Sequence, residues 1–312
     1  MAAALMSTYY TSVENMSTYY TSVDNIIKPA VFSLLDGVGL HLEPSCHLTS
    51  HLPLVSSPTP VILSVAAYLV LVSLGVLLSS SKNSTTSSSS PSPSSQTKRK
   101  DPYWLAVVVL FHNVFLVALS LYMCVRITYE ALVVNKYNVW GNAFKGEESE
   151  RMLAHTIWIF YVSKLYEFMD TFIMLLKGNL RQVSFLHVYH HGTISFIWWA
   201  ITFHAPGGDA YFSAALNSWV HVLMYAYYFL AATLPKEPSV RSRYLWWGKY
   251  LTLFQMSQFA ANFVQGIYAY ATGSYHSGIS ALLVGYMVSL LFLFGNFFVQ
   301  KHFAGGKKKK SA

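Results

Sequence analysis

The chain has 312 residues, of which 54% are hydrophobic and 16% aromatic, whereas only 11% are charged. A soluble domain carries about twice that share of charged residues, so the composition indicates a multi-pass membrane protein. The formal charge of +8 comes from short basic clusters between apolar runs, which is typical of loops beside an anionic leaflet and does not support nucleic-acid binding. The two cysteines, Cys46 and Cys124, have no CxxC or zinc-ligand spacing, so neither a disulfide framework nor a structural metal is expected.

Residues 1–57 form a mixed polar segment that we predict to be a lumenal N-terminal tail. The tail contains a tandem copy of one decamer, MSTYYTSVEN at 6–15 and MSTYYTSVDN at 16–25, which we interpret as a duplication in a tolerant region. No cleaved signal peptide is visible, so the first apolar run is expected to act as the signal. The membrane domain is predicted at 58–302, with a flexible Ser-rich cytosolic loop at 80–101, and a basic tail follows at 303–312.

Seven apolar runs are long enough to cross a bilayer as helices. They cover Val61–Leu78, Tyr103–Val125, Leu153–Leu176, Phe185–Phe203, Tyr211–Leu234, Tyr250–Ala271 and Ile279–Val299. The expected fold class is therefore all-α, a polytopic membrane protein of about seven transmembrane helices.

Seven spans place the two termini on opposite sides of the membrane. Lysine and arginine are concentrated in the loops on the side of the C-terminus, which predicts a cytosolic C-terminus and a lumenal N-terminus. On this topology Asn15 begins a lumenal N-glycosylation sequon. Lys309 and Lys310 form a dilysine signal for retrieval to the endoplasmic reticulum, the alternative being a basic tail that contacts anionic lipid.

The segment QVSFLHVYHH at 182–191 is the strongest motif of the chain. On a helix, His187, His190 and His191 share one face within about 100° of arc. The segment continues directly into an apolar span, so the three imidazoles are expected at or inside the bilayer. Ionisable groups at that depth are costly and usually functional.

A second motif, KLYEFMDT at 164–171, places charged residues inside the third span. Lys164 and Glu167 can neutralise each other at i, i+3, either as a pair that locks helix packing or as part of a site. Asp170 is the better candidate for orienting a histidine, because a carboxylate on the second ring nitrogen fixes the tautomer.

Two further spans carry polar stripes. NSWVHVLMYAYY at 217–228 aligns Asn217, His221, Tyr225 and Tyr228 on one face, which favours a functional role for His221. In TLFQMSQFAANFVQG the amides Gln255, Gln258, Asn262 and Gln265 share a face, and they either hold helices together or line a polar cavity. The remaining histidines lack such partners in sequence and are treated as background: His41, His47, His51, His112, His155, His204, His276 and His302.

These four motifs, in this order, resemble the ELO family of very-long-chain fatty acid elongases, membrane condensing enzymes of the endoplasmic reticulum. The likeness covers most of the region from 100 to 302. The wording of FYVSKLYEFMDT, FLHVYHH and APGGDAYFSAALNSWVHVLMYAYY is similar to algal and moss elongases of polyunsaturated acyl-CoAs, and it favours the Δ6 type, which extends C18 substrates, over the Δ5 or C20 type. The duplicated decamer and the Ser-rich loop depart from the family pattern outside the motifs.

The resemblance implies a very-long-chain 3-oxoacyl-CoA synthase that condenses an acyl-CoA with malonyl-CoA. The family picture is a ping-pong reaction through an acyl-histidine on His190, or alternatively on His191. The catalytic group would be His187, His190, His191, His221 and Asp170, with His187 and His221 orienting groups, relaying protons or stabilising an oxyanion. No cofactor or metal is expected, and the implied partners are membrane lipid and the ketoacyl reductase, dehydratase and enoyl reductase of the elongation cycle.

Substrate binding is assigned to two sets of residues. Within the spans these are Lys164, Glu167, Asn217, Tyr225, Tyr228, Gln255 and Gln258, of which Asn217, Tyr225, Gln255 and Gln258 are candidate hydrogen-bond donors to the enolate. In the cytosolic loops, Lys177, Arg181, Arg241, Arg243 and Lys249 are candidates for contacts with the phosphates of CoA.

Two other functions would use some of the same residues. A histidine-box di-iron desaturase or hydroxylase needs about eight histidine ligands in several boxes, whereas this chain offers one box plus His221. A seven-span transporter or receptor would explain Lys164, Glu167 and the amide stripe, but it gives no reason for three histidines on one face.

Overall fold

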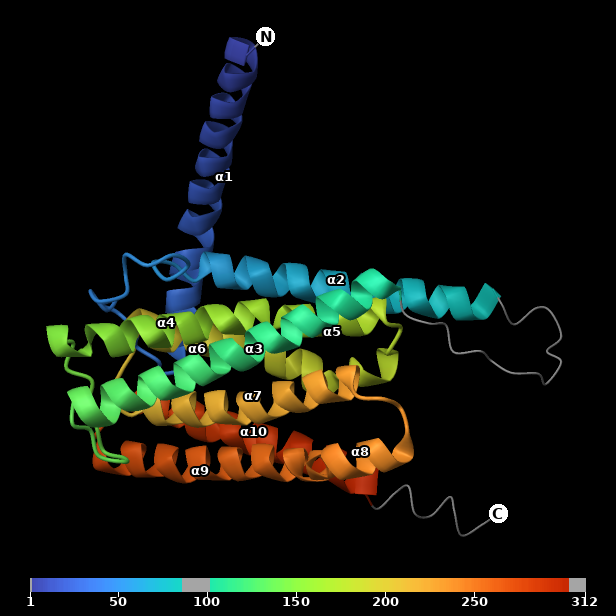
Figure 1. The fold of residues 1–312 in the computed structure, drawn as a ribbon. Helices are drawn as coiled ribbons and strands as arrows, with labels where there is room; N and C mark the ends of the chain where they lie inside the picture. The colour runs from blue at the N-terminus through green and yellow to red at the C-terminus, as the bar shows by residue number, and fades with distance from the viewer. Residues whose placement is uncertain (1, 86–101, 303–312) are drawn as a thin grey trace.

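The computed structural model describes the backbone of residues 2–85 and 102–302, and the side chains of residues 18–78 and 102–300. All regular secondary structure in these ranges is helical, which confirms the expected all-α class. Most of the helices run along a common axis as a bundle, and α1 (Ala2–Gly37) stands nearly perpendicular to that axis (Figure 1). Residues 86–101 of the Ser-rich loop and the tail with Lys309 and Lys310 lie outside the described residues.

The bundle is built from the segments that the sequence predicts as spans. Its helices are α2 (Thr59–Thr85), α3 (Tyr103–Tyr129), α4 (Arg151–Tyr166), α5 (Phe168–Leu176), α6 (Phe185–His204), α7 (Ala210–Thr233), α9 (Leu251–Thr272) and α10 (Ser277–His302). Short helices connect them: the π-helix η1 (Glu130–Val134), the 3-10 helices η2 (Glu148–Glu150), η3 (Leu180–Gln182) and η4 (Trp246–Tyr250), and α8 (Pro238–Tyr244). α2 extends as far as Thr85, into the segment predicted to be loop.

Three of these helices are long and apolar enough to cross a membrane, over Thr59–Leu78, Tyr103–Val134 and Ser277–Gln300. The other four predicted spans coincide with α4 together with α5, α6, α7 and α9, which carry the polar motifs. The number of spans therefore stays a prediction.

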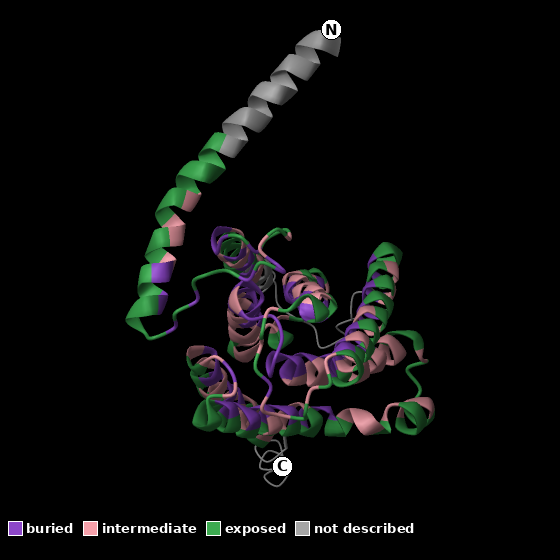
Figure 2. Ribbon diagram, turned by 90° about the vertical axis from the view of Figure 1, so that its left-hand side faces the viewer, coloured by how far each residue is buried: buried purple, intermediate pink, exposed green. Residues whose placement is uncertain are grey.

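The bundle has its buried residues inside and large apolar side chains outside. α3 packs along α7, α9 along α10 and α4 against α6. Viewed along the bundle axis, residues coloured as buried face one another between the helices (Figure 2). Apolar side chains such as Phe111 and Phe292 are 71% and 75% exposed on the outer surface. An outer surface of this kind is typical of contact with lipid.

The third predicted span is broken at its charged motif. α4 ends at Tyr166 and α5 begins at Phe168, with Glu167 between them at ψ −12°. The prediction of one uninterrupted helix for this span therefore fails at a single residue, Glu167. Glu167 contacts Lys164, while Asp170 and Thr171 on α5 contact side chains of other helices.

The predicted N-terminal tail is more ordered than its polarity suggested. Beyond α1, residues 38–58, here called the N-terminal strap, cross one end of the bundle, and Leu42, Leu48 and Val55 are completely buried. The indole of Trp199 donates to the carbonyl oxygen of Val55 at 3.1 Å. The strap therefore belongs to the core. Asn15 lies in α1, and its side chain is outside the described residues.

A buried carboxylate ties two loops together at the same end. Asp209 is 1% exposed, and it accepts hydrogen bonds from the backbone amides of Gly141 at 3.0 Å and Asn142 at 2.8 Å and from the Asn142 side chain at 2.9 Å. The preceding Gly208 has φ +50°, and a Cβ there would lie 2.7 Å from the Asn142 carbonyl oxygen. This close approach explains the glycine.

Replacing Asp209 by alanine is expected to destabilise the fold. Three donors lose their acceptor, and each buried unsatisfied group costs about 1–3 kcal/mol. Thermal unfolding of the detergent-purified protein should show a clearly lower midpoint than that of Asp36→Ala, a control because Asp36 is exposed. Equal midpoints for the two variants would contradict this role.

Candidate active site

The histidine motif forms the first two turns of α6, as its spacing predicted. Ser184 caps the helix, and its hydroxyl accepts from the backbone N–H of His187 at 3.3 Å. The rings of His187 and His191 have centroids 4.4 Å apart, and those of His190 and His191 are 5.5 Å apart. The helix therefore gathers all three imidazoles in one place.

Each imidazole has a different environment. His187 Nε2 lies 2.8 Å from Thr171 Oγ1, which is also 3.0 Å from the Tyr68 hydroxyl. His191 is 7% exposed, and its Nδ1 has no hydrogen-bond partner among the described residues. His190 Nδ1 lies 3.1 Å from the hydroxyl of Tyr286 on α10, and His190 alone of the three lines the main cavity. This geometry favours His190 over His191 as the residue that meets a substrate.

The Lys164–Glu167 pair is buried and joined to α7. The Lys164 ammonium donates to Glu167 Oε1 at 2.7 Å and to Asn217 Oδ1 at 3.1 Å. His221 Nδ1 lies 3.4 Å from the same Glu167 oxygen. A carboxylate beside Nδ1 keeps the proton there and leaves Nε2 of a neutral imidazole unprotonated. Glu167 is therefore the carboxylate that orients His221.

Asp170 orients a histidine, but not one of those predicted. Its Oδ1 accepts from His112 Nε2 at 2.8 Å, and its Oδ2 accepts from the Tyr225 hydroxyl at 2.6 Å. His112 lies 58 residues from Asp170 in the sequence, so no motif connects the two residues. Its ring also stacks on Tyr166 at 5.5 Å. The structure thus adds His112 to the residues around the site.

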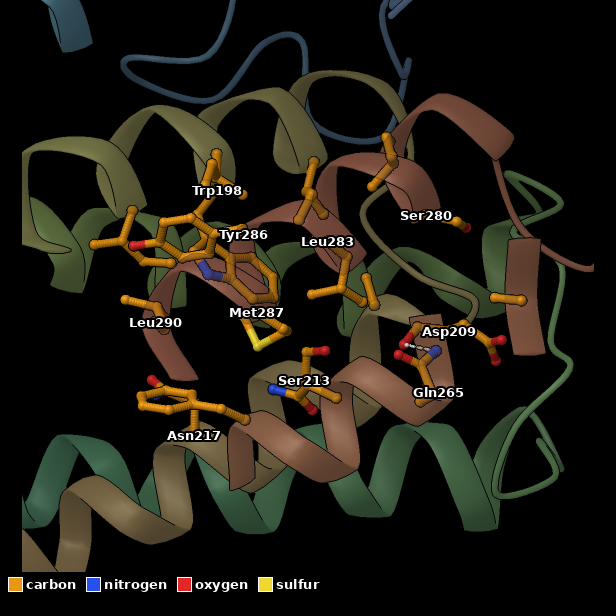
Figure 3. Close-up of a pocket in the computed structure, with 18 of the residues that line it drawn as sticks. Trp198, Asp209, Ser213, Asn217, Gln265, Ser280, Leu283, Tyr286, Met287 and Leu290 are labelled. Atoms are coloured by element: carbon orange, nitrogen blue, oxygen red, sulfur yellow. Dashed lines mark hydrogen bonds between the residues drawn. The ribbon is translucent and has the colours of Figure 1, made fainter. Parts of the chain in front are cut away.

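The main cavity has two unlike walls, and the space of about 720 Å³ between them includes a part that is open to solvent. One wall comes from α6 and α10 and is apolar, with Ile194, Ile197, Trp198, Ile201, Leu283, Met287 and Leu290. The other comes from α7 and α9 and carries Ser213, Asn217, Gln258, Asn262 and Gln265. Figure 3 shows Ser213 and Gln265 lying opposite Trp198 and Leu283.

The cavity is deep and begins at the histidine motif. His190 and Ile201 both line it, and 11 residues of helix at about 1.5 Å each span about 16 Å. Four polar oxygens in its lining have no partner among the described residues: Ser213 Oγ, Asn262 Oδ1, Gln265 Oε1 and Ser280 Oγ. Three of the four amides of the stripe, Gln258, Asn262 and Gln265, therefore line a cavity, which is the second of the two roles that the sequence allowed.

Other predicted site residues lie outside the cavity. Gln255 donates to the sulfur of Met224 at 3.7 Å, and Tyr228 is 41% exposed. The basic residues lie in the α5–α6 and α7–α9 loops, at the bundle end where α6 begins. Arg241 donates to the Ala231 carbonyl oxygen at 3.0 Å, whereas Arg181, Arg243 and Lys249 are exposed and Lys177 is half-buried.

Among the side chains of residues 18–78 and 102–300, the structure shows no group of three or more His, Cys, Asp or Glu with a geometry that could hold a metal ion. Imidazole is a good ligand for iron, so elemental analysis of the purified protein remains the test of a di-iron enzyme.

Comparison with known proteins identifies the family of the chain. Residues 53–310 match the family described as ELO: GNS1/SUR4 family. The chain belongs to this family. One relative is very long chain fatty acid elongase 5 of Homo sapiens. It is 39% identical over 219 residues, which cover 68% of this chain and 70% of that protein.

Two further relatives carry similar names. Fatty acid elongase 6 of Leishmania major is 44% identical over 198 residues, 61% of this chain, and very long chain fatty acid elongase 5 of Mus musculus is 38% identical over 217 residues, 68% of this chain. The match spans about half the length of the Leishmania protein, 51%, and 70% of the mouse protein.

Proposed function

We propose that this ELO protein is a condensing enzyme of fatty acid elongation, a very-long-chain 3-oxoacyl-CoA synthase. It joins a polyunsaturated acyl-CoA to malonyl-CoA and yields a 3-ketoacyl-CoA two carbons longer, CO2 and free CoA. The observation that carries the proposal is His190, which lies at one end of a deep cavity with an apolar wall. The elongase names of the relatives support the same reaction class.

In the first half-reaction, the His190 imidazole attacks the carbonyl carbon of the acyl thioester. The carbon–sulfur bond breaks, the acyl group stays on the ring nitrogen, and CoA leaves as the thiolate, which takes a proton from solvent. In the second half-reaction, malonyl-CoA loses CO2, and the released electron pair forms an enolate that attacks the acyl carbon. The carbon–nitrogen bond then breaks and restores His190.

The neighbouring polar groups suit the charges of these steps. Asn217 and Gln258 line the cavity near His190 and are the proposed donors to the enolate, an effect worth about 2.7–4 kcal/mol per donor. His221, oriented by Glu167, is the proposed proton relay. Arg181, Arg243 and Lys249 are exposed in loops at the same end of the bundle, where they can meet the phosphates of CoA.

The preferred acyl group in this proposal is a C18 chain of the Δ6 type. The sequence resemblance supports this preference. A Δ5 or C20 preference is the alternative within the family.

The proposed setting is the membrane of the endoplasmic reticulum. All seven predicted segments would cross it, with the N-terminus in the lumen and the C-terminus in the cytosol. Lys309 and Lys310 would serve retrieval, Asn15 would be available for glycosylation, and the reductases and dehydratase of the elongation cycle would act on the product.

Expression in yeast tests the function directly. Cells fed individually with C18 and C20 polyunsaturated acids are analysed as fatty-acid methyl esters, and we expect the C18 Δ6 acid to gain two carbons. Conversion of the C20 acid alone would overturn the preference. Absence of any lengthening, with the protein present in the membrane, would overturn the proposed reaction.

A further inference from the structure

The side chains of Thr193, Tyr286 and His190 form a chain of hydrogen-bond contacts. Thr193 Oγ1 lies 2.6 Å from the carbonyl oxygen of Tyr189, one turn earlier on α6. A carbonyl oxygen only accepts, so the single hydroxyl proton of Thr193 is used in this bond. Thr193 can therefore only accept from its other neighbour, the hydroxyl of Tyr286, at 3.1 Å.

This fixes the direction of the next bond. The Tyr286 hydroxyl also has a single proton, which it donates to Thr193. A second acceptor near this hydroxyl, the His190 carbonyl oxygen at 3.5 Å, also lies away from the imidazole. The contact of 3.1 Å between Tyr286 and His190 Nδ1 is therefore one in which Nδ1–H donates to the phenol oxygen.

We infer that Tyr286 and Thr193 are positioning residues that hold His190 in the tautomer with Nε2 unprotonated. No described side chain hydrogen-bonds Nε2, and both His190 and Tyr286 line the cavity. The lone pair of Nε2 is then free to form the bond to the acyl carbon. The Nδ1–H stays on the ring throughout, so the acylated ring is a cation hydrogen-bonded to Tyr286, and the group that leaves in the second half-reaction is neutral imidazole.

The inference rests on the proposed acyl-histidine, and the first half-reaction tests it separately. The purified full-length protein is mixed with acyl-CoA without malonyl-CoA, and the burst of free CoA and the hydroxylamine-sensitive acyl-protein are followed. Tyr286→Phe is expected to slow the burst about tenfold, as for the loss of one hydrogen bond at the reacting group, with KM for acyl-CoA little changed.

Thr193→Val gives the sharper outcome. Without its acceptor, the Tyr286 proton can turn to Nδ1 and favour the tautomer with Nε2 blocked, so this variant is expected to lose more activity than Tyr286→Phe. Adding Tyr286→Phe removes that proton, so the double variant should recover to the rate of Tyr286→Phe alone. Two merely structural side chains in contact would also couple, but the double variant would then be no more active than Thr193→Val alone.

Ser289→Ala is the matched control, because Ser289 lies on α10 and bonds Tyr189 and the Tyr286 carbonyl but not the imidazole. It should keep the wild-type burst. A normal burst in Tyr286→Phe, or a double variant no more active than Thr193→Val, would overturn the inference and leave the proposed function standing. Absence of a burst and of acyl-protein in the wild type would overturn both.

Discussion

Replacing His190 by alanine is expected to abolish condensation while the protein stays folded in the membrane. The side chain lines the cavity and supplies the only nitrogen that the proposed reaction acylates. Loss of a nucleophile typically lowers kcat by more than about 1,000-fold. Incorporation of labelled malonyl-CoA into 3-ketoacyl product, measured in membranes with equal amounts of protein, checks the result.

His51→Ala is the control for this experiment, because His51 is exposed and lies in the N-terminal strap rather than in the histidine motif. It should retain full condensation activity. Substantial activity in His190→Ala would remove the acyl-histidine mechanism at this residue, and a parallel His191→Ala variant would then show whether the neighbouring imidazole takes the role.

The second large effect is expected at the buried ion pair. Lys164 and Glu167 are 1% and 2% exposed, so replacing Glu167 by alanine leaves a buried ammonium without its carboxylate. Breaking a buried pair in this way costs about 3–5 kcal/mol. Thermal unfolding of the purified variant should therefore show a much lower midpoint than that of the wild type.

The double replacement Lys164→Met with Glu167→Leu separates stability from function. Removing both charges often restores most of the stability, because neither desolvated charge remains. Condensation should stay low, since His221 has lost the carboxylate 3.4 Å from its Nδ1. Recovery of both stability and activity in the double variant would mean that the pair only locks helix packing.

Much of the bundle was predictable because its signals are local. Runs of apolar residues place α2, α3 and α10, and Ser184 before a histidine repeat marks the start of α6. The spacing of His187, His190 and His191 also places their side chains on one face, as the structure confirms. The helix cap and the histidine spacing depend on residues fewer than five positions apart, and the apolar runs depend on consecutive residues.

The missed parts of the site depend on distant contacts. Tyr286 reaches His190 across 96 residues, and His112 reaches Asp170 across 58 residues, so neither residue has a partner that a motif could reveal. The one-residue break at Glu167 was hidden for another reason, because KLYEFMDT has the composition of a continuous helix.

The N-terminal strap was missed because its sequence is mixed, without a helical or strand period, and part of its attachment is through the main chain. Three successive carbonyl oxygens accept from aromatic donors: Pro53 from the Trp158 indole at 2.9 Å, Leu54 from the Tyr161 hydroxyl at 3.2 Å and Val55 from the Trp199 indole at 3.1 Å. Leu54 adopts φ +65° in doing so, and its own side chain is 40% exposed.

In these three contacts the helices supply the side chains and the strap supplies only carbonyl oxygens. The exposed side chains at positions 53 and 54 can therefore change without loss of the contacts. Any residue except one that disturbs the backbone path offers the same oxygen, so positions 53 and 54 can change during evolution while Trp158, Tyr161 and Trp199 cannot easily do so. Leu42, Leu48 and Val55 do not share this freedom, because their side chains are completely buried in the core.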